Sequence, residues 1–253
     1  MPLEIRAFRC LDDNIGVILR DVATGRVAAI DAPDEAPVVA ALDKEGWHLD
    51  EILVTHRHGD HVQGIPGLKE RYGCKVTAPA KAGAAVPGVD ATVKEGDTVA
   101  VGDSTAQVWE TPGHCSDHVT YVFEGVAFAG DTLFTLGCGR VLEDTPAVLW
   151  RSLQRLAGLP DATAIYSGHD YVLSNARFAL AADPDNAALK ERAEEAEMAK
   201  AQGRFLVPST LAMEKVTNPF LRAGEPALAR SVHKEGADAE TVFTALREWK
   251  NRF

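Results

Sequence analysis

The sequence lacks the features that define several large classes of protein. Its 253 residues hold four scattered cysteines and no CxxC pair. A chain of this length can bury a core without disulfides, so the cysteines need not form a disulfide framework. Because free cysteines are typical of reducing compartments, we expect a cytoplasmic location. No segment approaches the ~20 consecutive apolar residues of a membrane span, and residues 1–14 do not resemble a signal peptide. The cysteines are Cys10, Cys74, Cys115 and Cys138, and we expect structural roles for the last two.

Positive charge is also scarce. Lysine and arginine number 26 against 37 acidic residues, which gives a formal net charge of −11. This balance argues against nucleic-acid and membrane partners, although a local basic pocket could still take a small anion. The composition is otherwise ordinary, with 46% hydrophobic and 25% charged residues, so disorder and coiled coil are excluded. We expect a monomer or a weak homo-oligomer.

Short β-rich runs alternate with turns over the first two-thirds of the chain, and helical spacing appears between some of them. This order predicts an α/β fold in which helices pack on a mixed sheet. Composition changes near residues 168–172, so we expect a sheet-containing domain over 1–170 and a helical domain over 171–253. The predicted strands are 5–8, 16–20, 26–31, 51–56, 75–79, 98–101, 106–111, 118–123, 126–130 and 163–168. The predicted helices are 35–45, 65–72, 147–156, 185–204 and 236–253.

The densest cluster of metal-ligating side chains is the segment THRHGDH, directly after an apolar run. Alternate residues of an extended chain face the same way, so His56 and His58 can point at one site. Gly59 permits a sharp turn that would bring Asp60 and His61 round to face them. Imidazole and carboxylate are preferred ligands of zinc and its neighbours. The segment therefore predicts a metal site rather than a structural turn.

Three later strands also end in a glycine followed by a histidine or an aspartate, namely His114, Asp131 and His169. One such step is usually only a turn, but ligands in α/β proteins gather beyond the carboxyl ends of strands. Seven candidate ligands exceed what one tetrahedral ion needs. They suit two ions, about 3.5–4 Å apart, that share a carboxylate and generate a hydroxide near neutral pH.

These segments resemble the metallo-β-lactamase superfamily, whose fold is an αβ/βα sandwich with a binuclear metal site on one edge. The resemblance is closest to the hydroxyacylglutathione hydrolase (glyoxalase II) family, and it covers nearly the whole chain. The segments that carry it, besides THRHGDH, are GHCSDH, GDTLFTLGCGR, YSGHDYVLSNARFA and VPSTLAMEKVTNPFLR. The superfamily core alone would identify only a metallohydrolase, whereas the CGR loop and the tail indicate the family.

The resemblance implies a binuclear centre and the residues that hold it. Two divalent ions are implied, zinc first, with iron or manganese as alternatives. Asp60 and Asp131 are the residues expected to be catalytic. The first ion is assigned to His56, His58 and His114, the second to Asp60, His61 and His169, and Asp131 bridges them.

The resemblance also implies the substrate. The family hydrolyses S-2-hydroxyacylglutathione thioesters, above all S-D-lactoylglutathione in methylglyoxal detoxification, by a metal-bridging hydroxide. Residues 1–170 would be the catalytic domain and 171–253 the glutathione-binding domain. Arginine and lysine can pair with the two carboxylates of glutathione. The positions that match the glutathione-binding residues of the family are Arg140, Tyr171, Arg247 and Lys250. For Arg247 and Lys250 the alternative is that they lie on a solvated helix face.

The chain departs from the family pattern at four positions. Leu142 stands where the family often has a tyrosine, which puts the affinity for glutathione in question. Arg57, Asp117 and Asp170 also differ from the commoner residues. One alternative function is a persulfide dioxygenase of the same superfamily, which needs a single iron. Another is a non-catalytic metal-binding scaffold. A β-lactamase or lactonase would leave the basic residues of the tail unexplained.

Overall fold

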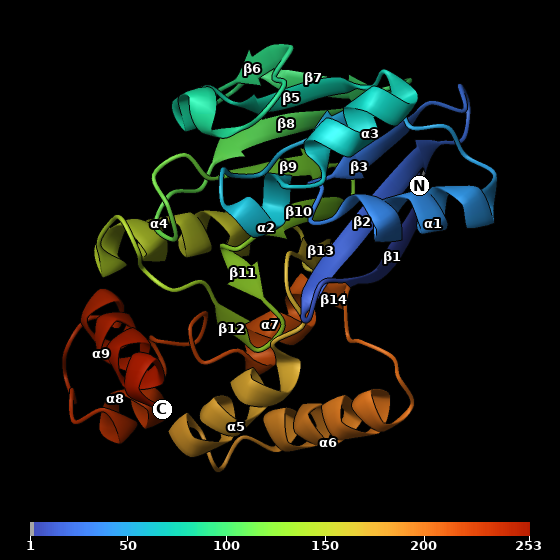
Figure 1. The fold of residues 1–253 in the computed structure, drawn as a ribbon. Helices are drawn as coiled ribbons and strands as arrows, with labels where there is room; N and C mark the ends of the chain where they lie inside the picture. Colours follow the sequence, from blue (N-terminus) through green and yellow to red (C-terminus); the bar gives the residue numbers. More distant parts are fainter. Residues whose placement is uncertain (1–2) are drawn as a thin grey trace. The chain divides into compact units, whose positions relative to one another are not determined.

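The computed structural model describes residues 3–253, which divide into two units (Figure 1). The first unit is the chain up to Glu110 together with Asp117–Gly130. The second unit is Thr111–Ser116 and Asp131–Phe253. Within residues 3–253, no helix is long and apolar enough to span a bilayer.

The first unit contains a six-stranded sheet in which neighbours in sequence are neighbours in space. The first two strand pairs of the sheet are antiparallel, and the remaining three pairs, from the third strand onward, are parallel. Parallel neighbours need a crossover connection, so helices separate the central strands and the strand ends emerge at one edge. The strands are β1 (Leu3–Cys10), β2 (Asn14–Asp21), β3 (Val27–Ile30), β4 (Glu51–Leu53), β5 (Lys75–Pro79) and β6 (Ala91–Val93).

The helices of the first unit are α1 (Glu35–Glu45), α2 (Gly59–Val62), α3 (Ile65–Tyr72) and the 3-10 helix η1 (Ala80–Ala85). Helices α1 and α3 cover one face of this sheet (Figure 1). Leu42 of α1 and Leu68 of α3 pack with Ile52 of β4 in one buried cluster. Helix α1 ends at Gly46, whose φ of 68° lies in the left-handed region that favours glycine.

Four antiparallel strands complete the first unit, in the order β7–β8–β9–β10. Tyr121 on β9 is fully buried, and its hydroxyl donates to the carbonyl of Val54 at 2.8 Å. The backbone N–H of Val119 donates to the carbonyl of Thr55 at 2.9 Å. These bonds tie β9 to the segment that follows β4. The strands are β7 (Thr98–Val101), β8 (Ser104–Glu110), β9 (Val119–Phe123) and β10 (Val126–Gly130).

The second unit is mainly helical. Alanines let α5 and α6 approach closely, and Ala176, Ala179 and Ala196 are buried between them. Trp150 of α4 packs on Phe243 of α9, with ring centroids 5.2 Å apart. The helices are α4 (Pro146–Ala157), α5 (Val172–Ala182), α6 (Ala187–Ala201), α7 (Leu211–Thr217), α8 (Pro226–Ser231) and α9 (Ala239–Arg252). The strands are β11 (Leu133–Phe134), β12 (Gly137–Cys138), β13 (Ala164–Ser167) and β14 (Ser209–Thr210).

Every predicted strand and helix is confirmed, with small differences at the ends. The strand predicted over 51–56 ends at Leu53, because the segment that carries the predicted ligands His56 to His61 leaves the sheet there. Helices α2, α5, α7 and α8, the 3-10 helix η1 and four short strands were not predicted.

The centre of β4 offers a direct test of this packing. Ile52 is fully buried, and Ile52→Ala should lower the free energy of unfolding by about 2–5 kcal/mol, because it removes buried methylenes and leaves a cavity. Val22, which is 56% exposed, is the control, and Val22→Ala should change stability by less than about 0.5 kcal/mol. Urea denaturation measures both. Equal, small losses would contradict the packing described.

Candidate active site

Four of the predicted metal ligands lie together in the first unit. His56 follows β4 and is fully buried, and its Nε2 lies 3.0 Å from His58 Nδ1. Asp60 and His61 lie on α2. The rings of His56 and His61 have centroids 4.1 Å apart, and His61 Nε2 is 3.8 Å from a carboxylate oxygen of Asp60. The structure therefore brings these three imidazoles and one carboxylate into one group. His118, for which no ligand role is predicted, is buried beside His56, with ring centroids 5.0 Å apart.

The sharp turn predicted at Gly59 is wrong. Gly59 begins α2, and its φ is not positive. A Cβ there would meet nothing within 4 Å, so neither conformational freedom nor a close approach requires glycine. An ordinary helical turn brings Asp60 and His61 to the other ligands.

Asp31 organises these ligands and was missed by the sequence analysis. It directly follows β3, is buried, and has a left-handed φ of 59°. One carboxylate oxygen accepts the backbone N–H of Thr55 at 2.7 Å, and the other accepts the Thr55 hydroxyl at 2.8 Å. His61 Nδ1 also lies 2.8 Å from this second oxygen. A carboxylate behind an imidazole fixes its tautomer, which leaves Nε2 as the nitrogen for a metal. The only local indication was an aspartate at a strand end.

Two of the departures from the family pattern compensate each other. The guanidinium of Arg57 forms an ion pair with Asp117, whose carboxylate also accepts the backbone N–H of Arg57 at 2.9 Å. The side chain of Asp117 is fully buried, whereas that of Arg57 is 26% exposed. The pair connects the segment of residues 55–61, which carries predicted metal ligands, to the chain just before β9.

The other three predicted ligands lie in the second unit, and all are buried. One oxygen of Asp131 is 3.5 Å from His114 Nε2 and 3.4 Å from His169 Nε2. Ligand atoms bound tetrahedrally at about 2.1 Å lie about 3.4 Å apart, so this spacing fits an ion. His114 Nδ1 is 3.0 Å from the carbonyl of Arg140, an arrangement that leaves Nε2 as the ring nitrogen for a metal.

A cavity of about 520 Å³ opens in the second unit. Leu142, where a family tyrosine is missing, is 58% exposed and lies outside the lining of this cavity. All four residues predicted to bind substrate contribute to the lining, together with two of the predicted metal ligands. These six residues are His114, Asp131, Arg140, Tyr171, Arg247 and Lys250.

Arg247 on α9 is buried and Lys250 is half-buried, and both donate hydrogen bonds to backbone carbonyls, so neither lies on a fully solvated helix face. Arg247 is only 3% exposed, and its Nη1 donates to the carbonyls of Cys138 at 2.9 Å and Gly139 at 3.3 Å. The ammonium group of Lys250 donates to the carbonyl of Ser174 at 2.9 Å. Burial lowers the pKa of Lys250 to about 8, with further contributions from the positive charges of nearby arginines, Arg247 first.

Two other features of the cavity were not predicted. Cys138 was expected only to fill space, but it forms part of the cavity wall, and burial raises the pKa of its thiol. The rings of His169 and Tyr171 stack in parallel, with centroids 4.8 Å apart. The stacking couples a predicted metal ligand to a predicted substrate-binding residue.

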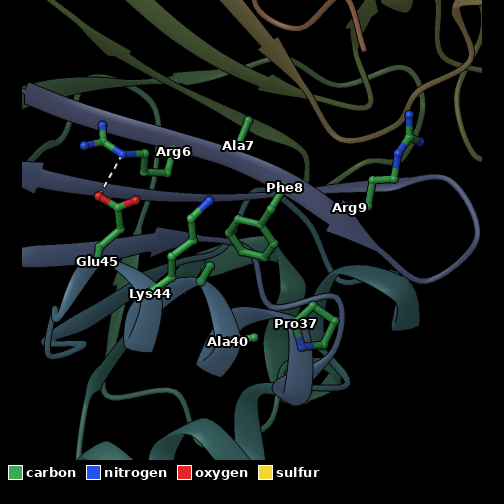
Figure 2. Close-up of a pocket in the computed structure, with 9 residues that line it drawn as sticks. Arg6, Ala7, Phe8, Arg9, Pro37, Ala40, Lys44 and Glu45 are labelled. Atoms are coloured by element: carbon green, nitrogen blue, oxygen red, sulfur yellow. Dashed lines mark ion pairs between the residues drawn. The ribbon is translucent and has the colours of Figure 1, made fainter. Parts of the chain in front are cut away.

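A second hollow lies between β1 and α1, and no predicted metal ligand or substrate-binding residue lines it (Figure 2). It is lined by Arg6, Phe8, Lys44 and Glu45 among others. Arg6 pairs with Glu45 at 2.9 Å, so the positive charge of Arg6 is already balanced within the hollow. None of the predicted site residues lines it.

The family of the chain follows from comparison with known proteins. Residues 16–169 match the family model of the metallo-beta-lactamase superfamily, and residues 170–253 match that of the hydroxyacylglutathione hydrolase C-terminus. The chain therefore belongs to the metallo-β-lactamase superfamily, and the predicted fold is confirmed. The hydroxyacylglutathione hydrolase of Methylobacterium nodulans is 69% identical over the full length of both chains. That of Methylobacterium sp. strain 4-46 is 68% identical, also over the full length of both chains. Within the superfamily, the chain is a member of the hydroxyacylglutathione hydrolase family.

A solved structure supports the same fold. The crystal structure of ETHE1 from Myxococcus xanthus is similar with a TM-score of 0.71 and 25% identity. The match covers 97% of this chain and 90% of that one.

A double-mutant cycle tests the pairing of Arg57 with Asp117 on metal-free protein. Arg57→Gln and Asp117→Asn should each lower the free energy of unfolding by about 1–3 kcal/mol, because each removes one partner of an ion pair whose carboxylate is fully buried. The double variant should lose less than the sum. Arg26, whose side chain is 56% exposed and pairs with Asp50, is the control, and Arg26→Gln should cost less than about 1 kcal/mol. Fully additive losses for Arg57 and Asp117 would rule out the coupling.

Proposed function

We propose that the protein hydrolyses S-2-hydroxyacylglutathione thioesters, S-D-lactoylglutathione to D-lactate and glutathione in particular. This reaction serves methylglyoxal detoxification in the cytoplasm. The observation that carries the proposal is the single cavity lined by both predicted metal ligands and basic side chains. Glutathione carries two carboxylates, and guanidinium and ammonium groups are their natural partners. We assign residues 1–170 to catalysis and 171–253 to substrate binding.

We propose two divalent ions, most simply zinc, held by the seven ligands that the family resemblance assigns. Neutral imidazole and carboxylate suit zinc, and they also suit iron and manganese. The near-equal distances from one Asp131 oxygen to His114 and His169 support a bridging role for Asp131. The contacts of His61 Nδ1 with Asp31, and of His114 Nδ1 with the Arg140 carbonyl, support metal binding through Nε2.

Bound ions supply hydroxide at neutral pH and neutralise charge that develops on the thioester oxygen. The residues of the chain orient the reactants. We assign Asp60 to orient the attacking water, since Asn14 holds its carboxylate by a hydrogen bond of 3.2 Å. The cationic cavity residues hold the glutathione moiety. The leaving glutathione thiolate is stable enough that the reaction needs no dedicated proton donor.

The reaction is tested with three compounds on one preparation. S-D-lactoylglutathione should be hydrolysed, and a chelator should abolish the activity. The D-lactoyl thioester of N-acetylcysteamine, which lacks the glutathione carboxylates, should show a kcat/KM roughly 100-fold lower, equivalent to ~2.7 kcal/mol of binding. Glutathione persulfide should cause no oxygen uptake. Oxygen uptake without hydrolysis would establish the dioxygenase instead, and binding of metal without turnover on any compound would establish the scaffold.

The pKa of Lys250 predicts a pH dependence of substrate binding. Lys250 is charged below pH 8 and loses its charge above it, so KM for the anionic substrate should rise between pH 7 and pH 9. The positive groups that face Lys250 are Arg140, Arg177 and Arg247, and Cys138 is the thiol beside it. Lys250→Ala should raise KM at pH 7 about tenfold with kcat changed less than about twofold.

The control for this pH dependence is Lys250→Arg. An arginine keeps its charge, so KM of this variant should stay flat from pH 7 to pH 9. Steady-state kinetics across that range measures both variants. A rise in KM of Lys250→Arg equal to that of the unaltered protein would assign the effect to another group.

A further inference from the structure

The hairpin of β11 and β12 forms one wall of the cavity through Phe134 and Cys138. The chain between the two strands is strained, because Leu136 has a φ of 59°. A left-handed conformation is unfavourable for a residue with a Cβ, because the Cβ comes too close to the following carbonyl oxygen. This loop therefore depends on contacts that hold it in place.

Side chains from distant segments bond four consecutive backbone positions of the loop. Glu214 on α7 accepts the backbone N–H of Leu136 at 2.8 Å. Asn218, just after α7, donates to the carbonyls of Phe134 at 3.2 Å and Gly137 at 2.9 Å. Asn175 on α5 donates to the carbonyl of Thr135 at 3.1 Å. All three side chains are buried.

Glu214 is the centre of this network. It is fully buried, and burial raises its pKa. Its other oxygen accepts the hydroxyl of Ser209 at 2.5 Å, and Ser209 in turn accepts a guanidinium N–H of Arg192 at 3.2 Å. Asn218 also donates to Glu214 at 3.0 Å. A buried carboxylate requires such partners, so the network keeps Glu214 in a single orientation.

The far side of the loop touches the cavity residues. The ring of Phe134 meets Tyr171 edge to face, with centroids 5.2 Å apart. The carbonyls that follow the loop, on Cys138 and Gly139, accept the guanidinium of Arg247. A shift of the loop would therefore move both an aromatic wall and a cation of the cavity.

We propose that Glu214 and Asn218 are positioning residues for substrate binding, which fix the loop from Phe134 to Gly137 in the shape that the glutathione moiety requires. This inference rests on the proposed function for the identity of the ligand. Neither residue lines the cavity, so each acts through the loop. Loss of either should weaken binding and leave the chemical step nearly unchanged.

The test compares Glu214→Gln and Asn218→Ala with two controls. Glu197→Gln changes an exposed acid on α6, and Leu228→Ala lowers the stability of the second unit by removing a fully buried side chain on α8. The readouts are the Kd for S-methylglutathione by calorimetry, KM and kcat for S-D-lactoylglutathione, and hydrogen exchange of residues 133–139.

Glu214→Gln and Asn218→Ala should raise Kd and KM about fivefold to tenfold, with kcat within about twofold. Exchange of the Leu136 amide should accelerate in both variants, and both controls should keep the Kd of the unaltered protein. Variants that lose stability but keep the Kd and the exchange rate would overturn the proposal. If the unaltered protein did not bind S-methylglutathione, the proposed function would fail, and slow exchange of the Leu136 amide in Glu214→Gln would still overturn the role of Glu214.

Discussion

The hydrogen bonds of the Asp31 carboxylate hold together the four predicted metal ligands of the first unit, His56, His58, Asp60 and His61. It stands at the end of β3, and it bonds the backbone and hydroxyl of Thr55 at the end of β4 and the ring of His61 on α2. Three segments that the sheet alone would only bring near one another are thereby fixed in one geometry. The orientation of an imidazole ligand is set by the group behind it, so this carboxylate matters as much as the ligands themselves.

The cavity of the second unit is lined by positive side chains, whereas the protein as a whole is acidic. The protein carries a net charge of −11, yet Arg140, Arg247 and Lys250 gather at one cavity. Their mutual repulsion and burial have a cost, which is visible in the lowered pKa of Lys250. An anionic ligand would relieve that cost. The concentration of positive charge in an otherwise acidic molecule is thus better explained by binding than by stability.

Sequence periodicity predicted most of the fold because the patterns it reads are local. Helix α1 has the predicted bounds, since its apolar spacing and its terminal glycine are both local signals. Helix α5 was not predicted because it is buried around much of its circumference, which weakens the amphipathic pattern. The predicted ligands were recognisable because four of them crowd into residues 56–61 and the other three follow a glycine after a strand. Their supports were not, because Glu214 and the Leu136 amide that it binds are 78 residues apart and no local pattern links them.

The central claim is that the seven assigned ligands hold two ions with Asp131 between them. Native mass spectrometry of protein purified without chelators measures this directly, with the Asp131→Ala variant in parallel. The account predicts two divalent ions per chain in the unaltered protein and the loss of at least one in the variant. One ion in the unaltered protein, or two retained in the variant, would contradict it.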